Sequence, residues 1–289
     1  MYSSKENVNI LTALLVKFGI SKAVVCPGSR NSPIVHNLCT CPDIECFPVT
    51  DERSAGFVAL GMSLADNEPV ALCVTSGSAL LNVASAAAEA FYQKRPLVII
   101  SGDRPAQWIN QQDGQTLQQH GALEPNVRKS VTLPEPHNEE ERWYCNRLVN
   151  EALNAALSQG FGPVHINIPI SEPLFKYDVP NERQIILHES VTDNTVSYEL
   201  AAELLQSERP MIVLGQMTPE VVGETMEALE VLKSTAVVIQ EKLADDSISS
   251  ALPIDEALIR IGNDESYRPD HLIYIGGTLV SKRLKQFLR

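Results

Sequence analysis

The sequence has little that would direct the protein to a membrane or to an oxidising compartment. Its 289 residues include only six cysteines, and two of these lie in Val-rich, strand-like runs where a thiol behaves as a small apolar group. No apolar run approaches the ~20 residues needed to span a bilayer, and residues 1–9 lack the pattern of a secretory signal. We expect reduced thiols, no membrane insertion and a cytoplasmic protein.

Basic residues are also scarce. Lys and Arg number 23 against 36 Asp and Glu, which gives a formal net charge of −13. Such a field repels nucleic acid and anionic membrane surfaces, so we expect neither as a partner. An anionic small substrate would need a local basic pocket that works against this field, and clustered Arg or Lys residues are therefore informative.

Several nucleotide and hydrolase motifs are missing. The chain contains no G-x-G-x-x-G, Walker A or G-x-S-x-G pattern, which weakens dinucleotide, nucleoside-triphosphate and serine-hydrolase interpretations. Cys39, Cys41 and Cys46 do not have the paired C-x-x-C spacing of zinc sites, and no His follows at ligand distance. We therefore expect no metal site within this chain.

What the sequence does contain is a regular alternation of strand and helix patterns. Short β-branched runs alternate with segments that have apolar residues at helical spacing. This alternation predicts an α/β, doubly wound fold with a parallel sheet covered on both faces. The predicted strands are 22–26, 45–49, 70–75, 97–101 and 164–168, and the predicted helices are 7–18, 54–64, 79–92 and 139–157, with a polar loop at 105–120.

A second α/β pattern follows a stretch in which the periodicity fades. Pro173, Pro180 and scattered charges mark this stretch. We predict a first domain at 1–172, a linker at 173–195 and a second, Rossmann-like α/β domain at 196–289 that is incomplete at its carboxyl end. Its predicted strands are 211–214, 236–240 and 271–275, and its predicted helices are 198–206, 219–232, 254–261 and 281–288.

Polar or Gly-rich turns follow four successive predicted strands of the first domain. They read PGSR at 27–30, DER at 51–53, TSGS at 75–78 and SGDRP at 101–105. Parallel sheets place their ligand crevices at the carboxyl ends of the strands. Taken singly, each turn is better explained without a ligand, with Arg30 solvated or Glu52 only favouring the positive end of a helix. Taken together, the four turns predict an anion-binding crevice that contains one carboxylate.

Seven runs in the first domain and one in the second resemble a known enzyme family. The runs are CPGSRNSP, VTDERSAGFVALGMSLA, VTSGSALLN, SGDRPAQW, DGQTLQQHGAL, GPVHINIP and SEPLF, in that order between Cys26 and Phe175, and GGTLVSKRL near the end. They are similar to the thiamine-diphosphate-dependent synthases of menaquinone biosynthesis. The resemblance implies that 1–172 is the pyrimidine-binding domain and 196–289 the central domain of such a synthase, although residues 176–270 match only in pattern.

The resemblance implies a transferase that decarboxylates 2-oxoglutarate and adds the remaining fragment to isochorismate, with thiamine diphosphate and Mg²⁺ as cofactors. In such enzymes a glutamate bonds the aminopyrimidine ring of the cofactor and takes part in its proton relay. Both substrates are dicarboxylates, which Arg can bind in bidentate geometry. The implied residues are Glu52, Gln115 and Ser29 for catalysis, Glu52, Gly77, Ser78 and Gln115 for cofactor binding, and Arg30, Arg104, Lys282 and Arg283 for substrate binding.

One part of the family's pattern is missing. The synthases carry a third domain with a Gly-Asp-Gly turn and a downstream Asn that bind magnesium and the diphosphate, and the only Gly-Asp here, Gly102-Asp103, is followed by Arg104. We therefore expect an incomplete chain that is inactive alone and forms a homodimer or higher homo-oligomer through exposed apolar surface. Two alternatives stay open: another thiamine-dependent lyase or carboligase, and a non-catalytic anion-binding module in which Lys282 and Arg283 form an ordinary basic helix face.

Overall fold

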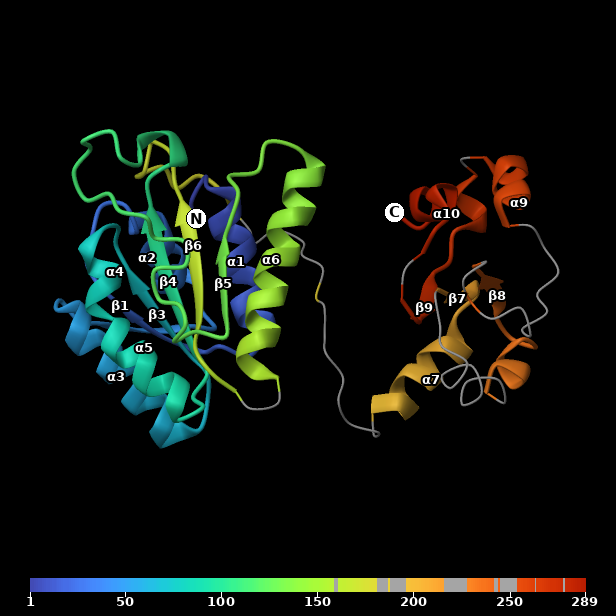
Figure 1. Ribbon diagram of the computed structural model, residues 1–289, viewed down its shortest axis with the longest axis horizontal. Coiled ribbons are helices and arrows are strands. Elements are labelled where there is room, and N and C mark those ends of the chain that lie inside the picture. The colour runs from blue at the N-terminus through green and yellow to red at the C-terminus, as the bar shows by residue number, and fades with distance from the viewer. Residues whose placement is uncertain are drawn as a thin grey trace. The chain divides into compact units, whose positions relative to one another are not determined.

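The computed structural model describes residues 1–158, 161–180, 187, 196–215, 228–241, 244, 254–262, 264–277 and 279–289. The chain divides into two compact units, Met1–Ser190 and Val191–Arg289 (Figure 1). Each unit is built on a parallel sheet with helices, so the predicted α/β class is confirmed. Within the predicted linker, residues 181–186 and 188–195 lie outside the described residues. No helix in the described ranges is long and apolar enough to cross a membrane.

The first unit contains a six-stranded parallel sheet in the order β2-β1-β3-β4-β6-β5. Its strands are β1 (Lys22–Val25), β2 (Glu45–Pro48), β3 (Val70–Val74), β4 (Leu97–Asp103), β5 (Lys129–Thr132) and β6 (Val164–Pro169). Every residue of β3 and β4 is buried, because helices cover both faces of the sheet. Since β1, β3 and β4 are parallel neighbours, their carboxyl ends meet at the same end of the sheet.

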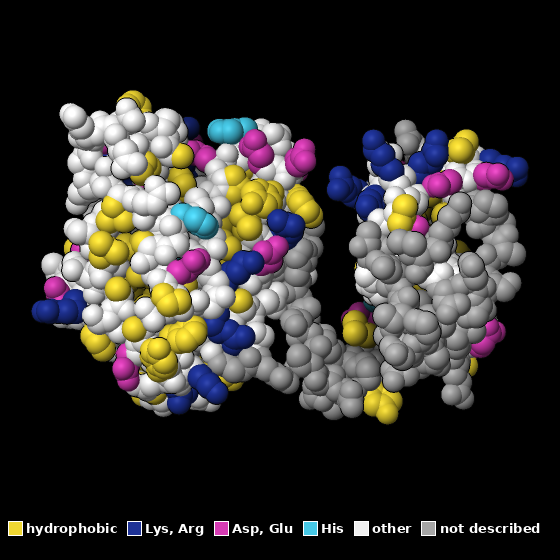
Figure 2. All heavy atoms as spheres, viewed as in Figure 1, with side chains coloured by type: hydrophobic (Ala, Val, Ile, Leu, Met, Phe, Trp, Pro, Cys, Tyr) yellow, Lys and Arg dark blue, Asp and Glu magenta, His cyan; other side chains and the backbone are white. Residues whose placement is uncertain are grey.

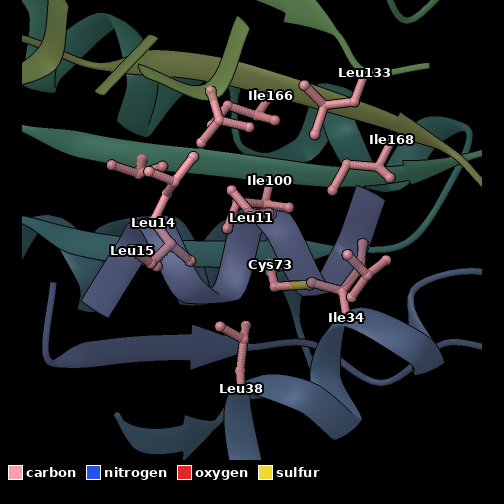
Figure 3. Close-up of a cluster of buried hydrophobic side chains, with 14 of the residues drawn as sticks. Leu11, Leu14, Leu15, Ile34, Leu38, Cys73, Ile100, Leu133, Ile166 and Ile168 are labelled. Carbon is pink, nitrogen blue, oxygen red and sulfur yellow. The ribbon is translucent and has the colours of Figure 1, made fainter. Parts of the chain in front are cut away.

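Two helical layers enclose this sheet. The helices α1 (Glu6–Lys17), α2 (Ser32–Thr40) and α6 (Glu139–Leu157) share one apolar cluster with the strands, and α3 (Glu52–Asp66), α4 (Ser78–Asn82) and α5 (Ala84–Tyr92) share a second. Figure 3 shows the first cluster, in which Leu11 and Leu14 of α1 lie among Ile100 of β4 and Ile166 of β6. Each such fully buried side chain contributes roughly 1.5–3 kcal/mol, so burial on both faces stabilises the unit.

Local sequence signals set several helix ends. Asn138 caps α6 by accepting a hydrogen bond from the backbone N–H of Glu141 at 2.9 Å, and the first turn of that helix carries three acidic residues. Asp51 caps α3 in the same way by accepting from the N–H of Ser54 at 2.8 Å. Both α6 and α9 (Ile254–Ile261) have the bounds that the sequence predicts.

Three elements differ from the sequence-based prediction. The single helix predicted at 79–92 is wrong, because α4 and α5 are separated at Val83, whose N–H bonds the carbonyl of Leu80 three residues earlier at 3.2 Å. This region packs closely on α3, where a Cβ on Gly56 would lie 2.8 Å from the Cβ of Ala86. Neither α2 nor β5 is predicted by the sequence. The short, polar strand β5 depends on its pairing with β6 rather than on its own pattern.

The second unit contains a three-stranded parallel sheet in the order β8-β7-β9. Its strands are β7 (Pro210–Leu214), β8 (Val237–Gln240) and β9 (His271–Ile275), and its helices include α7 (Val196–Gln206), α9 and α10 (Lys282–Phe287). Every residue of the central strand β7 is buried. All of these correspond to predicted elements. Of the helix predicted at 219–232, residues 219–227 lie outside the described residues, and residues 228–232 are helical.

Candidate functional site

The loops that follow β1, β3 and β4 approach one another at the carboxyl end of the first unit's sheet. A Cβ added to Gly28 would lie 2.4 Å from the Cβ of Thr75, and one added to Gly102 would lie 3.0 Å from the backbone of Arg30. Only glycine permits backbone approaches as close as these. The PGSR turn therefore contacts both the TSGS turn and the SGDRP turn, and the structure brings these three predicted segments together.

Arg30 is buried in this crevice, with 8% of its surface exposed. Its Nη1 donates to the carbonyl oxygen of Ile170 at 2.7 Å, and its Nη2 lies 3.2 Å from Oε1 of Glu172. Burial lowers the pKa of Arg30 from its ordinary value, and repulsion from Arg104 acts in the same direction, whereas Glu172 and Asp113 oppose both. Arg30 is therefore not a solvated turn residue, and it lies within electrostatic reach of Arg104.

Arg104 follows β4 and is partly buried. Its Nε donates to the carbonyl oxygen of Gly114 at 3.0 Å and lies 3.0 Å from Oδ2 of Asp113. These contacts hold the polar loop at 105–120 against the end of β4. Ser29, beside Arg30 in the sequence, is exposed. The crevice thus contains two arginines, each paired with a carboxylate, and a hydroxyl group open to solvent.

Glu52 is the first residue of α3 and is partly buried. Its Oε2 accepts a hydrogen bond from Nδ2 of Asn82 on α4 at 3.3 Å. The helix cap is Asp51, whose carboxylate accepts from the N–H and the hydroxyl of Ser54, and these bonds hold the pKa of Asp51 below its ordinary value. Burial raises the pKa of the nearby Cys26 thiol to about 12, and the charges of Glu52 and Asp51 add to this effect. The cap leaves Glu52 available for a ligand.

Gly77 and Gln115 form a backbone wall next to α4. Gly77 has a φ of 78° and a ψ of −140°, a conformation that favours glycine. A Cβ added to Gly77 would lie 3.1 Å from the backbone of Gln115, which itself has a φ of 56°. Ser78 is the first residue of α4, the helix that carries Asn82. The structure therefore brings Gly77, Ser78 and Gln115 together and joins Glu52 to the same helix.

A buried polar network connects the ends of β4 and β6, and the sequence patterns do not predict it. The side chains of Ser101, Gln119, His165 and Asn167 are at most 2% exposed. The Ser101 hydroxyl lies 2.8 Å from Nε2 of His165 and donates to Oδ1 of Asn167 at 2.8 Å. Burial raises the pKa of the neighbouring Asp103 carboxyl. Two sequence signals point to this network, which are an amide-rich run near Gln119 and an Asn inside the apolar run VHINIP.

Lys282 and Arg283 are the first two residues of α10 in the second unit, and both are exposed. Glu241 fixes the start of this helix, since its Oε1 accepts from the N–H groups of Val280 and Ser281 at 2.9 and 2.6 Å. Glu241 itself is 4% exposed. Both basic residues thus have a defined position within their own unit, which is a different unit from that of the two arginines in the crevice.

The cysteines of α2 and β2 are free thiols. Burial raises the pKa of Cys46, and the neighbouring Cys39 adds to this effect, so Cys46 stays a thiol at neutral pH. Among the residues that the structure describes, no group of three or more His, Cys, Asp or Glu side chains is placed to hold a metal ion.

Comparison with known proteins identifies the class. Residues 6–126 match the family model described as thiamine pyrophosphate enzyme, N-terminal TPP binding domain. The crystal structure of benzoylformate decarboxylase from Polynucleobacter necessarius aligns with a TM-score of 0.51 over 83% of this chain and 44% of that chain, at 19% identity, which shows the fold alone. The first unit thus combines a parallel-sheet fold with a match of residues 6–126 to the N-terminal binding domain of thiamine pyrophosphate enzymes.

Relatives in sequence narrow the identification. The chain is 47% identical over 298 residues to the 2-succinyl-5-enolpyruvyl-6-hydroxy-3-cyclohexene-1-carboxylate synthase of Bacteroides thetaiotaomicron, covering 100% of this chain and 53% of that protein. It is 40% identical over 296 residues to the synthase of the same name from Porphyromonas gingivalis, of which it covers 51%. The chain is therefore similar along its whole length to the amino-terminal half of these synthases, and it spans about half the length of these relatives.

Proposed function

We propose that this chain provides the pyrimidine-binding domain (1–172) and the central domain (196–289) of a 2-succinyl-5-enolpyruvyl-6-hydroxy-3-cyclohexene-1-carboxylate synthase, a transferase of menaquinone biosynthesis. The proposed reaction is the thiamine-diphosphate-dependent decarboxylation of 2-oxoglutarate and 1,4-addition of the succinyl-semialdehyde unit to isochorismate. The observation that carries this proposal is the position of Glu52. It is a carboxylate at the start of α3 that is not used as the helix cap and is bonded to α4.

The residues of the crevice fit the aminopyrimidine ring of thiamine diphosphate. When bound, this cofactor supplies the electron sink that decarboxylation needs. Glu52 would hold a proton against a nitrogen of this ring, as general acid–base catalysis requires. Gly77 has no Cβ, which lets its backbone lie close to that of Gln115, and Ser78 adds a hydroxyl at the start of α4. These groups bind and orient the ring.

Substrate carboxylates are assigned to the basic residues. Arg30 and Arg104 form ion pairs with Glu172 and Asp113, whose side chains are 68% and 36% exposed. Because the acidic partners are the more exposed members of these pairs, a substrate carboxylate can take their place. Ser29 adds a hydrogen-bonding group beside Arg30. Lys282 and Arg283 are the corresponding groups of the central domain, and they carry positive charge in a chain with a net charge of −13.

The diphosphate and Mg²⁺ are assigned to the half of the synthases that this chain does not span. Magnesium prefers oxygen ligands from carboxylates, amides and phosphate. Among the described residues of the crevice, Glu52 is a carboxylate that neither caps a helix nor forms a salt bridge, and it is assigned to the pyrimidine ring. The carboxylate of Asp103 is bonded to Asn167 and to the backbone of Arg104. The metal and the diphosphate therefore call for ligands beyond these residues.

A second copy of the chain is proposed to cover an apolar face of α3 and α4. Phe57 and Val58 on α3 and Leu81 on α4 are 46%, 41% and 48% exposed. Figure 2 shows hydrophobic side chains gathered on this part of the first unit. Exposed apolar clusters of this kind mark association surfaces. Because Glu52 begins the same helix, a homodimer through this face brings the partner close to the pyrimidine site.

The substitution Glu52→Gln in the full-length gene product tests the proposed function. We expect turnover to fall by roughly 100-fold or more with the melting temperature unchanged, because an amide cannot exchange the proton that general acid–base catalysis requires. The control is Glu45→Gln, which removes an exposed carboxylate of β2. The assay measures carbon dioxide release from 2-oxoglutarate with and without isochorismate. Near-normal turnover of Glu52→Gln removes Glu52 from the site.

The same assay distinguishes the alternative functions. Release of carbon dioxide without any dependence on isochorismate favours another thiamine-dependent lyase or carboligase. Binding of isochorismate without turnover, lost in Arg30→Ala, favours an anion-binding module. For the synthase, we expect Arg30→Ala to raise the KM for substrate more than the KM for thiamine diphosphate, since Arg30 is assigned to a carboxylate of the substrate.

A further inference from the structure

Gln119 contacts more of the crevice than any side chain singled out in the sequence. It lies between β4 and β5 and is 1% exposed. Its Oε1 accepts from the backbone N–H of Gly77 at 2.6 Å. Its Nε2 faces three acceptors, which are Oδ1 of Asn167 at 2.8 Å, the carbonyl oxygen of Gly102 at 3.2 Å and Oγ of Ser101 at 3.3 Å. One buried amide therefore joins the loop after β3 to β4 and β6.

The network continues from Gln119 to Arg104. Nδ2 of Asn167 donates to Oδ2 of Asp103 at 2.8 Å, and Oδ1 of Asp103 accepts from the backbone N–H of Arg104 at 2.8 Å. Each donor in this series faces an acceptor inside the protein. Removal of one member leaves a buried partner without its hydrogen bond, which costs more than an exposed bond would.

We propose that Gln119 is a positioning residue for the pyrimidine site: its side-chain amide holds the peptide of Gly77 and so fixes the wall that Gly77 forms with Gln115. This inference rests on the proposed thiamine-dependent function and adds a residue that contacts neither cofactor nor substrate. Gln119 is too buried to contact a ligand directly. It acts through Gly77, where a Cβ would lie 3.1 Å from the backbone of Gln115.

The Gly77 peptide needs a restraint because of its conformation. Gly77 and Gln115 have φ values of 78° and 56°, so two residues in the left-handed region face each other. Glycine also has more backbone freedom than any other residue. The hydrogen bond to Gln119 removes this freedom before a ligand arrives. Because the loop is already ordered, binding of a ring to the wall costs little conformational entropy, and little affinity is lost.

The substitution Gln119→Met tests the proposal, since Met has a similar size and no strong hydrogen-bonding group. Amide hydrogen exchange at Gly77, measured by NMR on this chain relative to the slowest amides of β4, is expected to become roughly tenfold faster, the factor for one lost hydrogen bond. In the full-length gene product, the KM for thiamine diphosphate is expected to rise by a similar factor of roughly ten. The KM values for 2-oxoglutarate and isochorismate should stay near those of the wild type.

The matched control is Asn37→Leu, which removes a buried amide between α1 and α2. Asn37 accepts from the N–H of Ser3 at 2.7 Å and donates to Oδ1 of Asn9 at 2.7 Å. It is as buried as Gln119 but belongs to a separate network. This variant should lower the melting temperature without changing Gly77 exchange relative to β4 or the cofactor KM.

The variant Gln119→Glu separates positioning from general packing. A carboxyl group keeps an acceptor for the N–H of Gly77, but it donates to Asn167 only when protonated. Asp103, His165 and His120 are the titratable groups around this position, so the cofactor KM is taken as a ratio to the wild type at each pH. The ratio for Gln119→Glu should fall towards one as the pH falls, whereas the ratio for Gln119→Met should not change.

Three results would overturn the proposal. They are unchanged Gly77 exchange in Gln119→Met, faster exchange with an unchanged cofactor KM, and an equal rise of the cofactor KM in Asn37→Leu. A wild-type full-length product that does not use thiamine diphosphate contradicts the proposed function instead. In that case the Gly77 exchange measurement still decides whether Gln119 fixes the wall.

Discussion

His165 sits in the sheet of the first unit as a neutral imidazole. Its Nε2 lies 2.8 Å from Oγ of Ser101 and its Nδ1 lies 3.3 Å from Oγ of Ser130, so each ring nitrogen faces a hydroxyl group. One hydroxyl can accept from the protonated nitrogen while the other donates to the unprotonated nitrogen, an arrangement that suits the neutral ring. Burial lowers the pKa of His165 to about 4, and His120 adds to the effect.

This buried imidazole makes the unit sensitive to acid. Between the ordinary pKa of 6.5 and the folded pKa of about 4, the unfolded chain binds a proton that the folded chain does not, so stability falls as the pH falls. The shift corresponds to about 3 kcal/mol. We predict that His165→Gln flattens the pH dependence of the unfolding free energy in this window, measured by denaturant titration. The exposed His137→Gln is the control.

Asp103 contributes to the same curve with the opposite sign. Its pKa is raised by burial, so the folded state keeps a proton that the unfolded chain has already lost. The informative quantity is therefore the difference in unfolding free energy between His165→Gln and the wild type at each pH. If that difference is constant from pH 6.5 to pH 4, His165 is not the acid-sensitive group.

Some of these residues can be found in the sequence and others cannot. Glu52 and Arg30 follow strands in runs that resemble a known family, and their location depends mainly on local chain order. Gln119 and Asn167 are 48 residues apart, and only the pairing of β4 with β6 brings them together. Periodicity contains no signal for such a contact, because each residue alone is an ordinary polar position.

At the scale of elements, α10 depends on a contact outside its own sequence. It spans only Lys282–Phe287, which is too short to be stable alone. Ser281 caps it by accepting from the N–H of Leu284 at 3.0 Å and donates to Oδ1 of Asp255 at 2.6 Å. Glu241 from the end of β8 holds the two N–H groups that precede the helix.

We predict that Glu241→Leu lowers the unfolding free energy of the second unit by about 1–3 kcal/mol, because it leaves buried N–H groups unpaired. Glu241→Gln keeps an acceptor and should cost less. In the full-length gene product, Glu241→Leu should raise the KM for substrate by displacing Lys282 and Arg283. Equal stability of the Leu and Gln variants in denaturant titrations would contradict this role of Glu241.

Local sequence patterns predict some of these elements correctly and fail for others. The predicted bounds of α6 are correct because a cap, an acidic first turn and regular apolar spacing agree. The Ala-rich run at 79–92 has the same helical appearance, yet it is divided at Val83 where α3 packs against it. The edge strand β5 has one buried residue and no strand pattern of its own. Tertiary packing decides both of these cases.

At the scale of the whole molecule, the proposed separation of the pyrimidine site from the diphosphate site predicts a measurable result. Most of the cofactor's charge lies on the diphosphate, for which the described residues offer no metal-binding group. We predict that calorimetric titration of this chain with thiamine diphosphate detects no tight binding and no effect of Mg²⁺. Micromolar binding that depends on Mg²⁺ would show that the chain contains its own diphosphate site.

The apolar face of α3 and α4 predicts self-association. We expect light scattering to give the mass of a dimer or larger assembly for this chain, because Phe57 and Val58 of α3 and Leu81 of α4 are exposed apolar side chains. Phe57→Glu should shift the population towards the monomer. Tyr92→Glu is the control, since Tyr92 is 79% exposed at the end of α5. A monomeric wild type would remove this face from the proposed assembly.

The strand order also determines when the crevice can form during translation. The strands β1, β2, β3 and β4 each pair with another member of that early set, but β5 pairs only with β6, which is made later. Asn167, the partner of Gln119, and Ile170, the partner of Arg30, leave the ribosome together with β6. A nascent chain that stops before residue 164 therefore exposes the unpaired edge of β4. Ribosomal pausing in this interval would favour aggregation over formation of the crevice.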